Sequence, residues 1–145
     1  MKTVVKTFKP EFVERVRGGE KSQTIRQFPK RGLPEVGDLF SARQWTARPY
    51  HSKQITIIES HVIAVQTFHI CREGWFYIGD EPNLFTKLDS SQSEILATQD
   101  GFTAQDSQPA HEQMLTFFKK NYKLPFKGIL IKWRPPKQSQ HKASA

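Results

Sequence analysis

Residues 19–26, with the sequence GEKSQTIR, combine a glycine turn, two cations and two hydroxyl groups within eight positions. The leading glycine and the glycine before it are expected to end a helix, because glycine readily adopts the left-handed conformation found at helix C-termini. The second half of the segment is expected to form a short strand. Side chains alternate between the faces of a strand, so Thr24 and Arg26 should point the same way, with Lys21 close by. The arrangement predicts an anion-binding site that contains a candidate nucleophile.

The chemistry of this site depends on the state of its lysine. A threonine hydroxyl is a weak nucleophile until a neighbouring base takes its proton. A lysine can be that base if burial or another cation lowers its pKa. Arg26 would lower the pKa of Lys21, and a nearby carboxylate would raise it. The alternative interpretation is that both cations only contact phosphate while Thr24 bonds to the backbone.

Charge points to the class of partner. The chain has 145 residues and a formal net charge of +8 at pH 7. This length suits one domain with one core. The charge suits a partner rich in phosphate, although a merely soluble basic protein is the alternative.

Several absences favour a cytoplasmic location. The sequence has no run of about 18 apolar residues that could span a membrane. Its N-terminus lacks the apolar stretch of a signal peptide. The single cysteine, Cys71, excludes an internal disulfide.

The pattern of apolar residues predicts strands separated by single helices. Strands are expected at residues 1–8, 22–26, 39–45, 54–70, 75–78 and 128–133, and the fourth of these is either one bent strand or two. Helices are expected to follow Pro10, to cover residues 94–98 with Ser91 or Ser93 as the cap, and to cover residues 109–122. The absence of a regular strand–helix alternation favours a small mixed barrel over a parallel sheet. We expect one domain over residues 1–134 and a disordered basic tail over residues 135–145.

The motif order resembles a known family. The spacing G-x-K-x-x-T-x-R, carried here by Gly19, Lys21, Thr24 and Arg26, is similar to the signature of ASCH domains within the PUA-like superfamily. Residues 36–39 (VGDL), 100–102 (DGF) and 129–133 (ILIKW) also resemble family elements and occur in the family's order. The resemblance covers roughly residues 1–134, with a longer and less familiar segment at 72–99. It implies an α+β fold, a PUA-like small mixed β-barrel of five to six strands flanked by two or three helices.

The resemblance also implies a cleft for nucleic acid. Family members are linked to RNA binding, some to RNA cleavage, and one compact subgroup hydrolyses N(4)-acetylcytidine. In that subgroup a lysine and a threonine of the signature are catalytic, together with a glutamate before the C-terminal helix. The matching positions here are Lys21, Thr24 and Asp100, and the aspartate departs from the family because its carboxylate lies one methylene closer to the backbone. We therefore expect binding of RNA or single-stranded nucleic acid, or of a modified nucleoside. A hydrolase of the same fold, either amidohydrolase or ribonuclease, is the alternative.

Basic residues crowd the first third of the chain, and aromatic residues offer stacking platforms. The nucleic-acid-binding residues are expected to be Lys21, Arg26, Phe28, Lys30 and Arg31. A solvated charged face is the alternative interpretation of these cations. Candidate platforms for an unpaired base are Trp45, Tyr50, Trp75 and Tyr77, although most aromatic residues of a small barrel belong to its core.

Metal and cofactor motifs are missing from the sequence. His69 and Cys71 would share one face of a strand, but two ligands do not make a zinc site. There is no glycine-rich phosphate loop and no G-x-S-x-G elbow. We expect a monomer without metal or cofactor.

Overall fold

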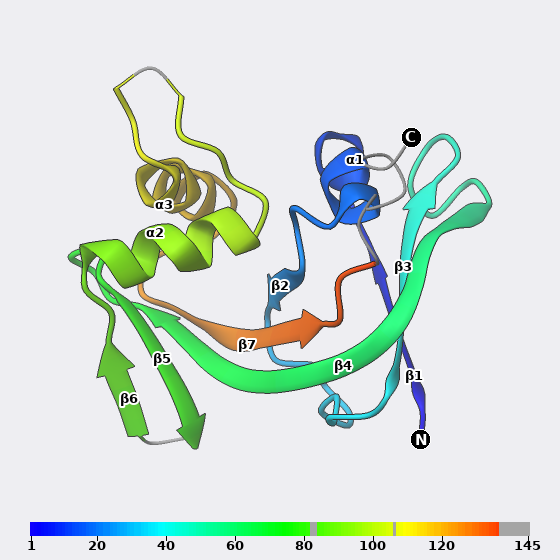
Figure 1. Cartoon of the computed structure of the whole chain (residues 1–145), viewed down its shortest axis with the longest axis horizontal. Helices are drawn as coiled ribbons and strands as arrows, with labels where there is room; N and C mark the ends of the chain where they lie inside the picture. Colours follow the sequence, from blue (N-terminus) through cyan, green and yellow to red (C-terminus); the bar gives the residue numbers. More distant parts are fainter. Residues whose placement is uncertain (82–83, 106, 137–145) are drawn as a thin grey trace, which may run out of the picture.

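A computed structural model of the chain describes residues 1–81, 84–105 and 107–136 (Figure 1). Its elements, in chain order, are β1 (Thr3–Thr7), α1 (Pro10–Gly18), β2 (Gln23–Arg26), β3 (Leu39–Trp45), β4 (Gln54–Ile70), β5 (Phe76–Glu81), β6 (Leu84–Lys87), α2 (Ser90–Gln99), α3 (Ala110–Asn121) and β7 (Phe126–Trp133). Mixed helices and strands of this kind confirm the α+β class. None of the helices in the described part of the chain is long and apolar enough to cross a membrane.

The strands form one seven-stranded sheet that does not close on itself. Its hydrogen-bonded path runs β1-β3-β4-β5-β6, and β7 pairs with both β4 and β2. The β1–β3 pair is parallel, and the other pairs are antiparallel. The expected count of five to six strands was too low, because β6 lies in a segment to which the sequence pattern assigned no structure.

Strand β4 joins the two halves of the sheet. It is one continuous strand of 17 residues, which decides between the two alternatives for this segment. Figure 1 shows it curving beneath β7 and the helices, from β3 on one side to β5 on the other. The register against β7 shifts between Val62 and Ala64. An extra residue at such a bulge changes which side chains share a face, so Val62 and Val65 both pack in the same apolar cluster.

Strand β7 lies between two apolar clusters instead of covering one core. Ile129 and Ile131 pack in the cluster that contains Trp133 and Phe40, whose rings stack with centroids 4.3 Å apart. Leu130 packs in the other cluster, which the helices α2 and α3 cover. Ile129 and Ile131 therefore face one cluster and Leu130 the other, and both faces of β7 are buried.

The N-terminus of α2 corrects a sequence prediction. Asp89 caps this helix, not Ser91 or Ser93. The Asp89 side chain accepts a hydrogen bond from the Gln92 N–H, and the Gln92 side chain accepts one from the Asp89 N–H. A capping box satisfies two backbone donors at once, which explains why the helix begins earlier than expected. Residues 72–99, the unfamiliar segment, thus supply β5, β6 and α2.

Most of the tail predicted to be disordered, residues 137–145, lies outside the described residues.

Candidate binding cavity and its buried ion pair

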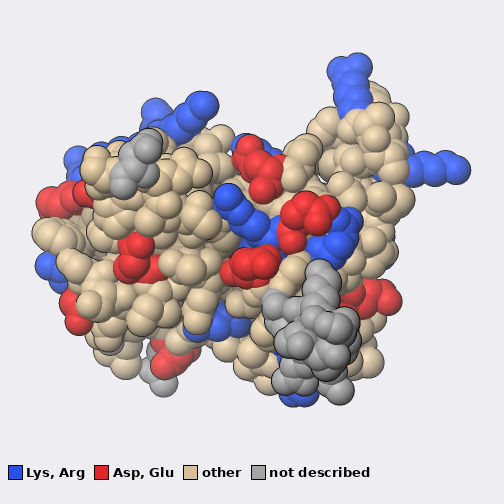
Figure 2. Space-filling model, turned by 45° about the horizontal axis from the view of Figure 1, so that its top comes forward, with Lys and Arg blue, Asp and Glu red and all other residues tan. Residues whose placement is uncertain are grey.

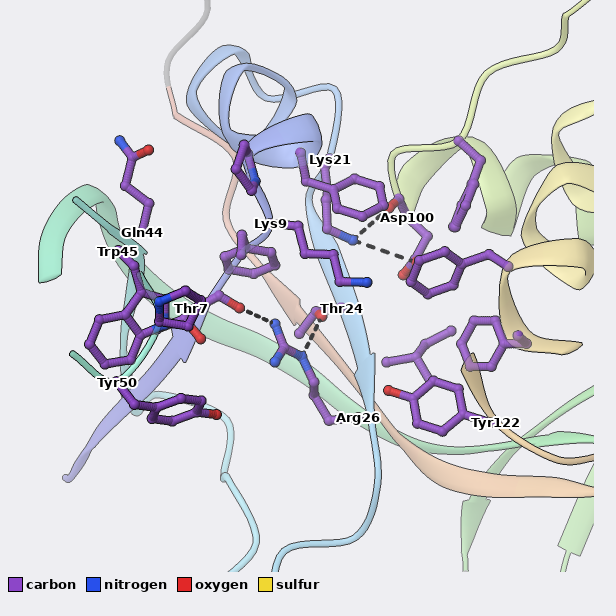
Figure 3. A pocket seen from close by; sticks show the side chains of 18 of the residues that line it. Thr7, Lys9, Lys21, Thr24, Arg26, Gln44, Trp45, Tyr50, Asp100 and Tyr122 are labelled. Atoms are coloured by element: carbon purple, nitrogen blue, oxygen red, sulfur yellow. Dashed lines mark hydrogen bonds and ion pairs between the residues drawn. The ribbon is translucent and has the colours of Figure 1, made fainter. Parts of the chain in front are cut away.

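A cavity of about 500 Å³ opens beside β2, between the N-terminal part of the chain and α3 (Figure 3). Its walls are largely aromatic, from Phe8, Phe12, Trp45, Tyr50, Phe117 and Tyr122. The polar residues among these rings include Lys21, Thr24 and Arg26 of the predicted signature, together with Asp100, Thr7, Lys9 and Gln44. The structure therefore brings together all three predicted catalytic residues.

The turn after α1 fixes the position of the lysine. Gly19 caps α1 in the left-handed conformation, with φ of 89°. The Lys21 N–H then donates to the Arg15 carbonyl at 2.9 Å, and the Ser22 N–H donates to the Gln99 carbonyl at 2.9 Å. The turn is thus held by the ends of two helices, and the Lys21 side chain leaves it toward the cavity.

The glycine after Asp100 allows the two loops to meet. Gly101 has φ of +99°, a backbone conformation that residues other than glycine rarely adopt. A Cβ atom on Gly101 would also lie only 3.0 Å from Lys21 Cδ. The Arg15 guanidinium donates a hydrogen bond to the Gly101 carbonyl and holds this loop against α1. The DGF loop that follows α2 therefore closes over the stem of Lys21.

Lys21 and Asp100 form a buried ion pair. Lys21 Nζ lies 3.5 Å from Asp100 Oδ2 and donates a hydrogen bond of 2.5 Å to the Asp100 carbonyl. Their side chains are only 4% and 7% exposed. On the far side, Gln23 Nε2 donates to Asp100 Oδ1 and to the Leu96 carbonyl, each at 3.2 Å. The carboxylate is therefore oriented from two directions.

Burial shifts both partners toward their neutral forms. Burial lowers the pKa of Lys21, the charge of Asp100 opposes that shift, and the positive charge of Arg26 adds to it. Burial raises the pKa of Asp100, and the charge of Lys21 opposes that shift. An amine held in this way loses its proton more readily than a lysine in water.

The hydroxyl of Thr24 is held by Arg26. Arg26 Nε donates to Thr24 Oγ1 at 3.0 Å, and Arg26 Nη2 donates to the Thr7 carbonyl at 2.7 Å. These contacts confirm that Thr24 and Arg26 share one face of β2, and Figure 3 shows their side chains together in the cavity. The guanidinium also lies 5.1 Å from the centre of the Phe8 ring. Since Thr24 accepts from Arg26, its own O–H remains available to donate.

The expected contact between base and nucleophile is not a hydrogen bond in this structure. Within the described part of the chain, the hydrogen bond of Lys21 Nζ goes to Asp100, and no hydrogen bond joins it to Thr24 Oγ1. Both side chains nevertheless line the same cavity. Proton transfer between the two side chains would therefore need a bridging water or a change of side-chain conformation.

Among the predicted aromatic platforms, two belong to this cavity. Trp45 and Tyr50 line it from β3 and from the hairpin that follows, with ring centroids 5.1 Å apart. Trp75 instead lies under Lys87, whose Nζ is 3.9 Å from the ring centre. Tyr77 packs against His69 and does not line the cavity.

The predicted residues of the next loop lie elsewhere. Lys30 and Arg31 are exposed and are not among the residues that line this cavity. Phe28 lines a second cavity of about 350 Å³, together with Phe85 and Lys127. Lys30 and Arg31 therefore do not line the cavity that contains Lys21 and Arg26, and their role in nucleic-acid binding stays a prediction.

Gln23 and Tyr122 are among the contributors that were not anticipated as site residues. Gln23 holds Asp100, and its signal in the sequence is a polar residue on the same strand face as Ile25, which packs in the core. Tyr122 ends the helix predicted over residues 109–122; it is the C-cap residue of α3 and lines the cavity. Only its position at the predicted helix end distinguished it from the core residues.

Metal ligation has no support in the described residues. No three His, Cys, Asp or Glu side chains gather there in a way that could hold an ion.

Comparison of the chain with protein-family models, curated proteins and solved structures found no match. The function of the chain is therefore inferred from the residues of the site.

Proposed function

We propose that the cavity binds one unpaired base of RNA or of another single-stranded nucleic acid. The observation that carries this proposal is an aromatic cavity of about 500 Å³ with a buried lysine–aspartate pair and an arginine in its wall. Its volume falls within the range of about 300–1,000 Å³ of small-molecule sites. Flat aromatic walls suit a base, because every base presents a π-face for stacking.

The aromatic walls and the polar groups of the cavity would contact different parts of a base. Trp45 and Tyr50 offer tilted rings, and Tyr50 is 83% exposed, so its ring is accessible. Arg26 uses two of its nitrogens for protein contacts and keeps further N–H donors. The amide of Gln44, also in the cavity wall, can both donate and accept. Stacking would hold the base, and these groups would bond to its polar edge.

The assignment to the ASCH group of PUA-like domains is part of the same proposal. It is supported by the position of the signature, since Lys21, Thr24 and Arg26 all contribute to one cavity. The open seven-stranded sheet leaves the barrel itself as a prediction. The cytoplasmic location and monomeric state expected from the sequence also belong to the proposal.

Charge alone does not outline the nucleic-acid path. On the face drawn in Figure 2, basic and acidic side chains alternate around the middle of the molecule. The net charge of +8 would still attract a polyanion at a distance. Specific contacts must therefore come from identified residues such as Arg26.

A hydrolase is the second candidate, and the buried Lys21–Asp100 pair favours it. Neutral Lys21 would take the proton of Thr24 while Thr24 Oγ1 forms a bond to the acyl carbon of an acylated exocyclic amine. The protonated lysine would then return the proton to the departing base amine as the carbon–nitrogen bond breaks. Water would release the acyl group from Thr24, and Asp100 would keep the lysine oriented throughout.

Binding and turnover can be measured on the same protein. Trp45 lines the cavity, so a stacked base should quench tryptophan fluorescence, and Trp45→Phe should remove that quenching. Arg26→Ala should weaken binding of a twelve-nucleotide RNA more than Lys53→Ala, a change at an exposed residue that lines none of the described cavities. Equal effects of the two changes, or no quenching by any nucleoside, would contradict the proposal.

Turnover is tested with N(4)-acetylcytidine and with labelled RNA. Release of cytidine or shortening of the strand, lost in both Lys21→Ala and Thr24→Ala, would establish an enzyme. Without turnover on either substrate, a binding domain is the better account.

A further inference from the structure

A third cavity, of about 630 Å³, lies at the C-terminal end of α3 and the connection to β7. It is lined by four lysines that we call the lysine groove: Lys119, Lys120, Lys123 and Lys127. All four are exposed. The ion pairs found among the described residues involve none of them. The groove therefore gathers positive charge without a carboxylate partner in that part of the chain.

Stabilisation of the helix explains only part of this cluster. Cations in the last turn of a helix interact favourably with its dipole, which accounts for Lys119 and Lys120. Lys123 and Lys127 lie beyond Asn121, the last residue of α3, and so outside the last turn in which this dipole effect acts. Four unpaired like charges in one groove repel one another, and a bound polyanion would offset that repulsion.

The lysine groove adjoins the aromatic cavity. Tyr122 lines both. Arg26 lines the aromatic cavity, and the next residue, Gln27, lines the groove. In the same way Phe118 lines the aromatic cavity, and the next residue, Lys119, lines the groove. One wall of side chains therefore separates the two spaces, along both β2 and α3.

The groove also leads to the cavity of Phe28. Lys127 lines the groove and this second cavity, and its Nζ lies 6.0 Å from the centre of the Phe85 ring. Arg26, Gln27 and Phe28 thus contribute in turn to the aromatic cavity, the groove and the second cavity. An aromatic site, a cationic groove and a second aromatic site in this order match the alternating bases and phosphates of a strand.

We propose that the lysine groove binds the phosphates of a single nucleic-acid strand, one base of which occupies the aromatic cavity. This inference rests on the proposed function and adds where the phosphates of the bound strand lie. Lysines act on phosphate as point charges and need no fixed geometry, which suits exposed side chains on a helix end. The strand then runs past Tyr122 toward Phe28.

The test compares two double variants that each remove two positive charges. K120Q/K123Q alters the lysine groove, and K53Q/R134Q alters exposed cations that line none of the three cavities. Affinity for a labelled twelve-nucleotide RNA is measured between 50 mM and 500 mM salt, and nucleoside binding is followed by Trp45 fluorescence. A polyglutamate chain of similar charge serves as a second polyanion, and thermal melting checks that each variant folds.

For K120Q/K123Q, the slope of log affinity against log salt should fall by about 1.4, since each phosphate contact of a single strand contributes about 0.7. Extrapolated from 1 M salt, this corresponds to about 60-fold weaker RNA binding at 50 mM. Nucleoside quenching should not change, and polyglutamate should bind more weakly than RNA.

Each of the other outcomes would refute the groove, its nucleic-acid ligand or the proposed function. An unchanged RNA affinity, or an equal loss in K53Q/R134Q, refutes the groove while nucleoside quenching still supports the cavity. Polyglutamate binding as tight as RNA binding, and lost in the same variant, makes the groove a site for acidic protein instead. If neither nucleoside nor RNA binds the wild-type protein, the proposed function fails and the groove proposal fails with it.

Discussion

Replacement of Lys21 by methionine should destabilise the fold strongly at neutral pH. The change keeps most of the aliphatic stem but removes Nζ, which lies 5.6 Å from the centre of the Phe8 ring and 5.0 Å from that of Phe12. It removes the charge that faces Asp100, a carboxylate with only 7% of its side chain exposed. It also leaves the Asp100 carbonyl without its 2.5 Å hydrogen bond. A buried charge that loses its partner is costly because water cannot replace that partner.

The size of the effect follows from this geometry. Removing one partner of a buried pair typically costs about 3–5 kcal/mol, whereas removing both is often close to neutral. The double variant K21M/D100N should therefore recover most of the loss. It should remain about 1–3 kcal/mol below wild type, because the Asp100 carbonyl stays unpaired. Urea unfolding followed by circular dichroism measures all three proteins.

The loss should also depend on pH. Asp100 has a folded pKa above its ordinary value of 3.8. At pH values between the unfolded and the folded pKa, the native state therefore keeps a proton on Asp100 that the unfolded state has released. Such a group lowers the free energy of unfolding as pH rises from about 3.8 through the folded pKa. Without Lys21 the pKa of Asp100 rises further, so the deficit of Lys21→Met should be small near pH 4 and largest near pH 7. In the double variant residue 100 carries an amide that does not titrate, so this residue should add no pH dependence to the free energy of unfolding.

Two results would refute this reasoning. The first is a Lys21→Met protein as stable as wild type at pH 7, which would mean that the pair is not buried in solution. The second is a double variant less stable than Lys21→Met, because neutralising the orphaned carboxylate must help if its burial is the cause.

Three further outcomes are expected. Trp45→Ala should weaken RNA binding by about 1–3 kcal/mol in a fluorescence anisotropy titration, the usual value of one base–aromatic stack, and an unchanged affinity would remove Trp45 from the site. Phe28→Ala should weaken binding of a twelve-nucleotide RNA but not of a single nucleoside, since Phe28 lines the second cavity; equal losses on both ligands would contradict the strand path. Asp89→Ala should lower the free energy of unfolding by about 1 kcal/mol through loss of the capping box. Ser91→Ala is its control, and the cap assignment is wrong if the two changes have equal effects.

Much of the local structure was determined by the sequence itself. The glycine pair predicted the end of α1, and the alternation in β2 placed Thr24 and Arg26 on one face, where a 3.0 Å hydrogen bond joins them. The alternation in β7 likewise assigned Ile129 and Leu130 to opposite faces. These features depend on neighbours one to four residues apart, whose preferences are set by backbone geometry.

The tertiary structure alone decided how the site is assembled. Lys21 and Asp100 are 79 positions apart, and their hydrogen bond exists because Gly101 lets two loops approach closely. The same packing left Lys30 and Arg31 outside the cavity although they follow Arg26 closely in the sequence. It also brought Tyr122 to the boundary between the aromatic cavity and the lysine groove. Residue spacing fixes which face a side chain takes on its own element, whereas the elements that meet are chosen by burial of apolar surface across the whole chain.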